Sequence, residues 1–223
     1  MRLMTLPGVF RPHSDSLLLA EHLREAVEPG ASVADVCTGS GVLAVTAACS
    51  GAGTVVAIDV SRRAVLTTWI NARLNRVSIR ARRGDLFAPL DGERFDLIVS
   101  NPPYVPAADD ALPTRGRARA WDAGRDGRAL LDRICAQVPA RLRPGGSVLL
   151  VHSSVCDADR TVEMLSGGGL DAEVLVRSRG PLGPLLRDRS ATLEQRGLLS
   201  PDAREEELVL IRGRQLGFGE AEP

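Results

Sequence analysis

The stretch Asn101-Pro102-Pro103-Tyr104 directly follows the apolar run "FDLIVS" at 95–100. Proline has no N–H to give to a sheet ladder, so a strand at 95–100 must end there. The Asn101 side-chain oxygen and the Pro102 carbonyl could accept the two N–H bonds of a planar nitrogen. Pro103 would stiffen this turn and Tyr104 would pack flat on the acceptor group. The nitrogen lone pair would then be aimed at an electrophile by positioning, without a strong base. Taken alone, the tripeptide Asn101-Pro102-Pro103 is more typical of a rigid turn than of an active site.

A glycine-rich loop lies upstream, in "ADVCTGSGVLA". Gly39 and Gly41 allow a sharp turn and a close approach of the backbone to a ligand. The helix expected over 41–50 would present free N–H groups at its N-terminus. The spacing fits the dinucleotide pattern GxGxxA, which is a weak signal by itself. Cys37 and Thr38 complete the loop and are candidate ligand contacts.

Three aspartates follow three successive strand-like runs. Asp35 stands just before the glycine loop, Asp59 ends "TVVAID", and Asp85 follows "VSIRARRG" with Leu86 beside it. A carboxylate at Asp35 would repel a pyrophosphate but attract a positively charged amine or sulfonium. Asp59 could hold two ribose hydroxyls, and Asp85 could accept the exocyclic amine of an adenine with Leu86 against the ring. Together they predict a cationic adenosyl ligand, S-adenosyl-L-methionine. The predicted reaction is therefore methyl transfer to a nitrogen atom of a substrate that Asn101 holds.

Each aspartate also has a structural role open to it. Asp35 could brace the loop, Asp59 could cap the next helix, and Asp85 could close a turn. For Asp85 alone the structural role is the better interpretation. All three fall at the carboxyl edge of the predicted sheet, where such sheets bind ligands, and their joint placement favours the ligand site.

The elements that position these residues alternate between strand and helix patterns. This alternation predicts a single α/β domain with a doubly wound, seven-stranded, mostly parallel sheet covered on both faces. Ser61 and Asp126 are the expected caps of the third and fourth helices. Strands are predicted at 32–37, 54–59, 77–81, 95–100, 144–152, 172–178 and 207–213, and helices at 14–27, 41–50, 62–75, 126–142 and 157–166.

Three regions surround or interrupt this pattern. Residues 1–30 form an N-terminal segment and helix, and residues 31–213 form the main domain. Within that domain, 179–206 is polar and arginine-rich and is expected to leave the sheet, with a short helix inside it. Residues 214–223 are expected to be a disordered tail. Trp69 lies in a helix pattern and is expected in the core.

Composition excludes several function classes. The 28 basic and 28 acidic residues balance, so a broad electrostatic surface for nucleic acid is absent. The four cysteines have no metal-site spacing, and no metal is expected. No signal-peptide core or membrane-length apolar run is present, which favours a cytoplasmic location with reduced thiols.

At this point the chain resembles a class I S-adenosylmethionine-dependent methyltransferase with an [ND]-P-P-[YFW] motif. More narrowly, it resembles the HemK/PrmC superfamily of protein-glutamine methyltransferases, and in it the short eukaryotic and archaeal branch. "VFRPHSDSLLLAEHL" is similar to that branch's Y-x-P-x-E-D-[TS] opening, and "ARAWDAGRDGRALL" to its AW-x-GG-x-x-G segment. The resemblance covers about residues 9–178 and the last strand.

The resemblance implies N5-methylation of the GGQ glutamine of a translation release factor, held by Asn101 and the backbone of the following residues. It also implies that the opening helix covers the cofactor. Contacts to S-adenosylmethionine are implied for the residues at matching positions: Ser16, Asp35, Cys37, Asp59, Asp85, Leu86 and Asn101. Two alternatives stay open, a small-molecule N-methyltransferase and, less favoured, a nucleic-acid adenine-N6 methyltransferase.

Three departures from that branch matter. Cys37 replaces the usual first glycine of the loop. The segment 179–206 has no counterpart and would alter the substrate entrance. The short branch uses a small zinc-binding activator beside the third strand, but here that strand is charged, "RVSIRARRGD". Since charged edges resist strand pairing, we expect independence from such a partner, or a dimer.

Overall fold

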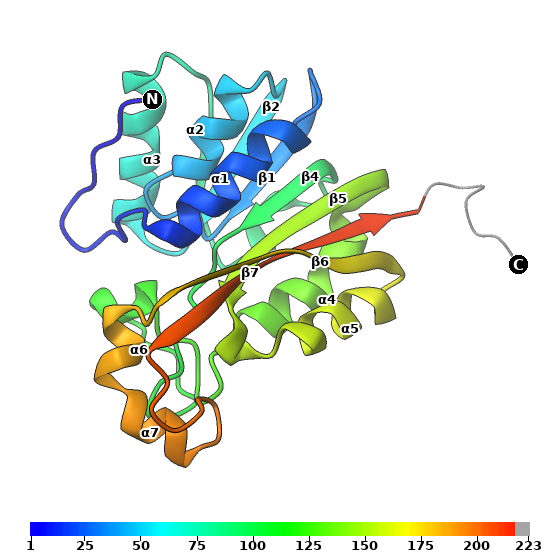
Figure 1. Ribbon diagram of the computed structural model, residues 1–223. Coiled ribbons are helices and arrows are strands. Elements are labelled where there is room, and N and C mark those ends of the chain that lie inside the picture. Colours follow the sequence, from blue (N-terminus) through cyan, green and yellow to red (C-terminus); the bar gives the residue numbers. More distant parts are fainter. Residues whose placement is uncertain (217–223) are drawn as a thin grey trace, which may run out of the picture.

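One mixed β-sheet runs through the computed structural model, which describes residues 1–216 (Figure 1). Within these residues the strand order is β3-β2-β1-β4-β5-β7-β6. The first five strands of this order pair in parallel, and β7 pairs antiparallel to β5 and β6. The predicted seven-stranded, mostly parallel sheet is therefore confirmed for the described residues. Its strands are β1 (Ser32–Val36), β2 (Thr54–Asp59), β3 (Arg80–Arg83), β4 (Phe95–Ser100), β5 (Leu142–Ser153), β6 (Leu170–Pro181) and β7 (Glu205–Gln215).

The sheet changes winding direction between β1 and β4. From β1 the chain builds outward through β2 and β3, then returns to add β4 and β5 on the other side. Val36 pairs with Ser100 at the carboxyl ends of β1 and β4, and the Ser100 hydroxyl donates to the Val36 carbonyl at 2.6 Å. The glycine loop and Asn101 therefore leave the sheet side by side, at the switch point where doubly wound sheets bind ligands.

Helices cover both faces of this sheet (Figure 1). On one face, α1 and α2 bury Leu19, Leu23 and Leu43 against β1, β4 and β5. On the other, α4 and α5 bury Ile134, Val138 and Leu165. The helices are α1 (Ser14–Ala26), α2 (Val42–Cys49), α3 (Arg62–Leu74), α4 (Leu131–Arg141), α5 (Ala158–Gly167), α6 (Pro184–Asp188) and α7 (Ser190–Gln195). None of the helices within the described residues is long and apolar enough to span a bilayer.

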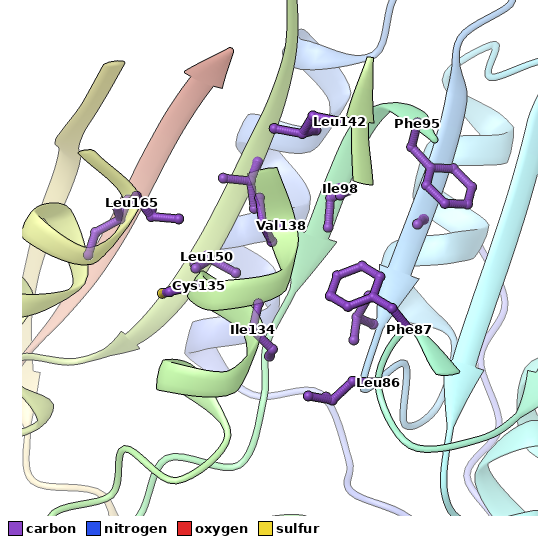
Figure 2. Close-up of a cluster of buried hydrophobic side chains, with 14 of the residues drawn as sticks. Leu86, Phe87, Phe95, Ile98, Ile134, Cys135, Val138, Leu142, Leu150 and Leu165 are labelled. Carbon is purple, nitrogen blue, oxygen red and sulfur yellow. The ribbon is translucent and has the colours of Figure 1, made fainter. Parts of the chain in front are cut away.

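Aliphatic side chains form most of the core beneath α4. Figure 2 shows Ile134 and Val138 of α4 beside Ile98 of β4 and Leu150 of β5, and all four are fully buried. Leu86 also reaches this cluster, at 3% exposure, from the loop after β3. The core therefore fixes the strand ends and the loop that carry the predicted site.

Two elements begin three or more residues later than predicted. β3 begins at Arg80 instead of 77, because Arg76 adopts a left-handed φ of 58° and Val77 N–H closes the end of α3 on the Ala72 carbonyl. α4 begins at Leu131 instead of 126, and Asp126 does not cap it. Asp126 instead accepts the Arg128 N–H at 2.9 Å in a turn that precedes the helix.

The caps at Ser61 and Asp157 explain two other helix starts. Ser61 accepts the Ala64 N–H, as predicted. Asp157 accepts the Arg160 N–H at the start of α5.

Trp69 was predicted to be core, and this was wrong, because its side chain is 49% exposed. Trp69 lies on the side of α3 that faces the β3 edge of the sheet, where it borders an open surface hollow with Leu66, Ile79 and Arg80. The Arg73 guanidinium lies 5.1 Å from the Trp69 ring centroid, a distance typical of a cation–π contact.

The excursion predicted at 179–206 is shorter in the structure. β6 continues to Pro181 and β7 begins at Glu205, so the segment outside the sheet is 182–204, here called the arm. The arm contains α6 and α7 in place of one short helix. β7 also extends to Gln215, so the predicted disordered tail was wrong for 214–215, and 217–223 lie outside the described residues.

Candidate active site

A cavity of about 890 Å³ opens at the carboxyl ends of β1, β2 and β4. Its volume is typical of a site for a nucleotide-sized ligand with room for a second molecule. Four parts of the chain line it: the opening segment before α1, the glycine loop, the Asn101–Val105 turn and the arm. Of the predicted site residues, the lining includes Ser16, Cys37, Thr38, Gly39, Asp59, Asp85, Leu86, Asn101, Pro102, Pro103 and Tyr104.

Asp35 and Gly41 are the predicted site residues that do not line this cavity. Asp35 is fully buried beneath the glycine loop, where its Oδ2 accepts the Thr38 hydroxyl at 2.5 Å and the Ala44 N–H at 3.0 Å. Gly41 has φ +81°, and a Cβ there would come within 2.8 Å of the Thr68 side chain. Both residues therefore shape the loop from behind.

Cys37 starts the loop in a left-handed conformation, φ 62°, which favours glycine. Burial, followed by the charges of Asp59, Asp35 and Asp85, raises the pKa of its thiol well above the ordinary value. The thiol is therefore protonated at neutral pH and is a poor nucleophile. Its role here is to form part of the cavity wall.

Asp59 ties the glycine loop to the start of α3. Its Oδ2 accepts the Gly39 N–H at 3.0 Å and its Oδ1 accepts the Ser61 N–H at 2.8 Å. Burial raises its pKa, against the two backbone hydrogen bonds and the charge of Arg119, which lower it. Asp85 is half-exposed at the cavity edge and is paired with Arg133 at 2.6 Å. Each Asp59 oxygen accepts one hydrogen bond and keeps a second lone pair, and Asp85 Oδ1 has no partner within residues 1–216, so both carboxylates can still accept from a ligand hydroxyl or amine.

A chain of hydrogen bonds joins the start of α1 to the Asn101–Tyr104 turn. Asn101 Nδ2 donates to the Ser16 hydroxyl at 3.0 Å, which in turn donates to Asp15 at 3.2 Å. The Tyr104 hydroxyl donates to the other oxygen of Asp15 at 3.0 Å. Since Ser16 holds Nδ2, Asn101 Oδ1 is turned away from it. Within residues 1–216 no group of the protein donates to Asn101 Oδ1 or to the Pro102 carbonyl.

The turn is also supported from behind. The Tyr104 carbonyl accepts from the Cys156 thiol at 2.9 Å. Gly127 packs against the same carbonyl, with φ +75°. Buried Arg128 donates to the carbonyls of Cys156 and Asp157, the latter at 2.7 Å, and so fixes the segment that carries the thiol.

The arm closes the outer side of the cavity. Leu182, Leu186 and Leu193 form a small core with Val105 and Val155, and Tyr104 and Trp121 pack against it. Arg189 pairs with Asp122 at 2.7 Å, and Arg196 donates to the carbonyls of Ala107, Ala108 and Arg125. The Trp121 carbonyl also accepts the Val105 N–H at 2.7 Å, which fixes the return of the loop after the turn.

A family model described as "Methyltransferase small domain" matches residues 1–115 of this chain. A Methanocaldococcus jannaschii relative assigned as a protein N5-glutamine methyltransferase is 33% identical over 83% of this chain and 93% of its own length. This chain belongs to the methyltransferase small domain family. The resemblance to glutamine methyltransferases seen in the sequence is confirmed.

Bacterial relatives of this methyltransferase are longer. A release factor glutamine methyltransferase of Geobacter sulfurreducens is 35% identical, and the match covers 73% of this chain but 59% of the relative. A ribosomal protein uL3 glutamine methyltransferase of Bradyrhizobium diazoefficiens is 40% identical over 60% of this chain and 42% of the relative. This chain therefore spans about half the length of the bacterial relatives that it matches.

Solved structures confirm the class I methyltransferase fold. The Mtq2–Trm112 complex of E. cuniculi, which methylates the termination factor eRF1, has a TM-score of 0.63 at 19% identity and covers 93% of this chain and 99% of that one. A T. thermophilus 16S rRNA methyltransferase in complex with AdoMet and guanosine has a TM-score of 0.60 at 22% identity, over 95% of this chain and 46% of that one.

S-adenosyl-L-methionine is the cofactor of this family, and the site fits its charge. Asp35 and Asp59 have no ion-pair partner within residues 1–216, and Asp35 Oδ1 is buried without a hydrogen-bond partner. An unpaired buried carboxylate is costly and gains from a nearby cation. Burial, more than the nearby Asp59 charge, raises the pKa of Asp35 to about 7. The methyltransferase therefore offers excess negative charge where a cationic ligand is expected.

This raised pKa makes the unfolding free energy of the ligand-free methyltransferase depend on pH. Since the folded-state pKa lies above the ordinary value of 3.8, the protonated Asp35 stabilises the fold below pH 4, and this contribution is lost as pH rises through 7. The side chain of Asp35→Asn cannot ionise. The unfolding free energy of this variant relative to wild type should therefore rise by roughly 2–3 kcal/mol from pH 5 to pH 8. Urea unfolding of both proteins at each pH measures this.

The comparison with the variant cancels the opposite titration of His152, whose pKa burial lowers to about 4. A difference between the two proteins that does not change with pH would contradict the account of Asp35. The variant should also lose affinity for cationic S-adenosylmethionine more than for its neutral demethylated product.

Sequence reasoning missed several residues of this site. Asp15 is 5% exposed and links Ser16 to Tyr104, but in "HSDSLLL" it reads as an ordinary first-turn acid of a helix. Cys156 and Gly127 are distant in sequence from the turn that they support, and no pattern signals that contact. Arg119 lies in the arginine-rich stretch "TRGRARAW", which is typical of an exposed loop, yet it is half-buried and lines the cavity.

Proposed function

We propose that this methyltransferase transfers a methyl group to the N5 nitrogen of a glutamine in a translation release factor. The observation that carries the proposal is the orientation of Asn101. Its Nδ2 is held by Ser16 at 3.0 Å, so Oδ1 and the Pro102 carbonyl are two free acceptors on one rigid turn. An unsubstituted carboxamide has two N–H bonds that match this pair.

A carboxamide nitrogen is a poor nucleophile because its lone pair is delocalised. Two acceptors on its N–H bonds would pin the nitrogen and stabilise the positive charge that develops there. Bound S-adenosylmethionine supplies an electrophilic methyl group on sulfur. The acceptor nitrogen forms a bond to the methyl carbon as the carbon–sulfur bond breaks, with the electron pair left on sulfur. The nitrogen then loses one proton, which can pass to water.

Tyr104 is proposed to pack on the acceptor amide and not to act as a base. Burial raises the pKa of its phenol well above 10, and the nearby charges of Asp15 and Glu206 add to this. The hydroxyl therefore stays protonated and donates to Asp15 at 3.0 Å. The proposed roles of Ser16, Asp59, Asp85 and Leu86 toward the cofactor follow from their places in the cavity lining.

The relatives support a protein acceptor. They include release factor and ribosomal protein uL3 glutamine methyltransferases, whose names share an acceptor group but differ in the protein that carries it. The arm supports the same conclusion, because it walls the outer cavity with Pro184, Leu185 and Leu186, a surface suited to a peptide.

Labelled S-adenosylmethionine incubated with the methyltransferase and an extract of the source cells tests the proposal. We expect label in a protein of release-factor size, and an initial labelling rate about 10²- to 10³-fold lower when Asn101→Ala replaces the wild type. Label in nucleic acid would favour the adenine-N6 alternative, and label in the low-mass fraction would favour a small-molecule acceptor. Either result would overturn the proposed function.

We further propose that the chain acts in the cytoplasm and without a small zinc-binding activator. Its four cysteines are all free, as expected for a reducing compartment. β3 lies at one edge of the sheet and presents the exposed side chains of Arg80, Arg82 and Arg83, which disfavour the addition of another strand. Activity of the protein purified alone tests this, and inactivity cured by a small zinc protein would overturn it.

A further inference from the structure

Residues 1–13 run along the outside of α3 before the chain enters α1 (Figure 1). None of these thirteen residues is buried, yet every residue from Thr5 to His13 lines the cavity. A segment with so little buried apolar surface opens at low free-energy cost unless polar contacts hold it. We call residues 1–13 the strap.

Asn71 on α3 and Asn75, which caps the C-terminal end of that helix one turn later, hold the strap through paired hydrogen bonds. Asn71 Oδ1 accepts the Met4 N–H and Asn71 Nδ2 donates to the Met4 carbonyl, both at 2.9 Å. Asn75 makes the same two contacts with Arg2, at 2.8 Å and 2.6 Å. Each carboxamide therefore bonds both the N–H and the carbonyl of one strap residue, as a residue of a neighbouring β-strand would.

Arg63 adds a third contact near the other end of the strap. Its guanidinium donates to the Pro7 carbonyl at 3.0 Å, beside a turn in which the Val9 N–H bonds to the Leu6 carbonyl. Arg63, Asn71 and Asn75 lie on one side of α3, because Asn71 follows Arg63 by eight residues and Asn75 follows Asn71 by four. The strap is thus held along its length by hydrogen bonds to one helix.

Asn71 also reaches the glycine loop. It is fully buried, and its Nδ2 donates to the Ser40 carbonyl at 2.8 Å as well as to Met4. One side chain therefore links the strap to the loop that faces the cofactor. A ligand that orders the loop would favour the closed strap, and opening the strap would loosen the loop.

We propose that Asn71 and Asn75 hold the strap closed against the cofactor pocket, and that breaking these contacts sets the release rate of the demethylated cofactor. The inference rests on cofactor binding and needs no particular methyl acceptor. Asn71 is a positioning residue in this proposal, and Asn75 acts on the strap alone.

The test measures the dissociation rate constant of tritiated S-adenosylhomocysteine by dilution into unlabelled ligand. Met4→Pro deletes the N–H that donates to Asn71 while leaving α3 and the glycine loop intact. Asn75→Ala deletes both contacts to Arg2. Since one neutral hydrogen bond changes an equilibrium about 2- to 10-fold, we expect each variant to release the ligand about 3- to 10-fold faster.

Leu3→Pro is the matched control, because it places proline beside Met4 at a residue whose N–H has no partner within residues 1–216. Its release rate should stay within twofold of wild type. Rates within twofold for Met4→Pro and Asn75→Ala would overturn the proposal, as would a Leu3→Pro rate as fast as that of Met4→Pro. In steady state, strap variants should change KM for the cofactor and leave the single-turnover methyl-transfer rate unchanged, which a general loss of structure would not do.

Because the assay contains no acceptor, it separates the two proposals. A methyltransferase that fails to modify glutamine but shows accelerated release in the strap variants would refute the proposed function alone. One that modifies glutamine with unchanged release rates would refute the strap alone.

Discussion

Asn101→Ala should lower kcat about 10²- to 10³-fold, which is the usual loss when one preorganised hydrogen-bonding group of an active site is removed. The variant loses the Oδ1 acceptor for the glutamine N–H, and the amide nitrogen is then free to turn away from the methyl group. Affinity for S-adenosylmethionine should fall far less, because Asp35 and Asp59 remain. Single-turnover transfer to a release factor, with calorimetry of cofactor binding, measures both quantities.

Asn101→Asp is the informative companion variant. It keeps an acceptor oxygen but cannot donate to Ser16, the contact that now fixes the side chain at 3.0 Å. We expect its kcat to lie between those of wild type and Asn101→Ala. If Asn101→Ala kept kcat within threefold of wild type, acceptor positioning by this residue would be refuted.

Gly127→Ala should impair both folding and catalysis. At φ +75° any Cβ is strained, and here it would also overlap the Tyr104 carbonyl and the Cys156 thiol. The unfolding free energy should fall by at least about 3 kcal/mol, since strain and overpacking add. A displaced turn should also lower kcat about 10²-fold, because small errors in the placement of reacting groups are costly. Urea unfolding and turnover measure the two effects.

Gly145→Ala is the matched control for that variant. Gly145 has nearly the same φ, +76°, but a Cβ there would meet nothing within 4 Å. It should lose about 1–2 kcal/mol through backbone strain and keep wild-type kcat. If the two substitutions lowered the unfolding free energy and kcat equally, the contact of Gly127 with Tyr104 would have no role in folding or catalysis.

The sequence was a good guide wherever one local pattern determined the outcome. β4 begins and ends where predicted, since an apolar run is stopped by Pro102. α1 and α3 also lie within a residue or so of their predicted bounds, because their apolar spacing and the Ser61 cap are local signals. The relation between the glycine loop and Asn101 followed from topology, since both leave parallel strands at the same sheet edge.

What the sequence did not reveal depends on contacts between distant segments. Asp35 is a candidate cofactor contact by its strand-end position, but its side chain braces the loop and does not line the cavity. Trp69 is a large apolar side chain on a helix and was expected in the core, but no helix or strand of the described residues covers it, so it is exposed. The pairing of Asn71 with Met4, 67 residues apart, has no sequence signature. Such contacts require the three-dimensional arrangement.

The most direct test of the central claim, that the Asn101–Tyr104 turn presents a glutamine nitrogen to a sulfonium methyl group, is the position of the transferred methyl. A release factor methylated by this enzyme with isotope-labelled S-adenosylmethionine would be digested and sequenced by tandem mass spectrometry. We expect one methyl group on a glutamine side-chain nitrogen, and loss of most of that signal with Asn101→Ala. Methylation on any other residue type, or an unchanged signal with Asn101→Ala, would contradict it.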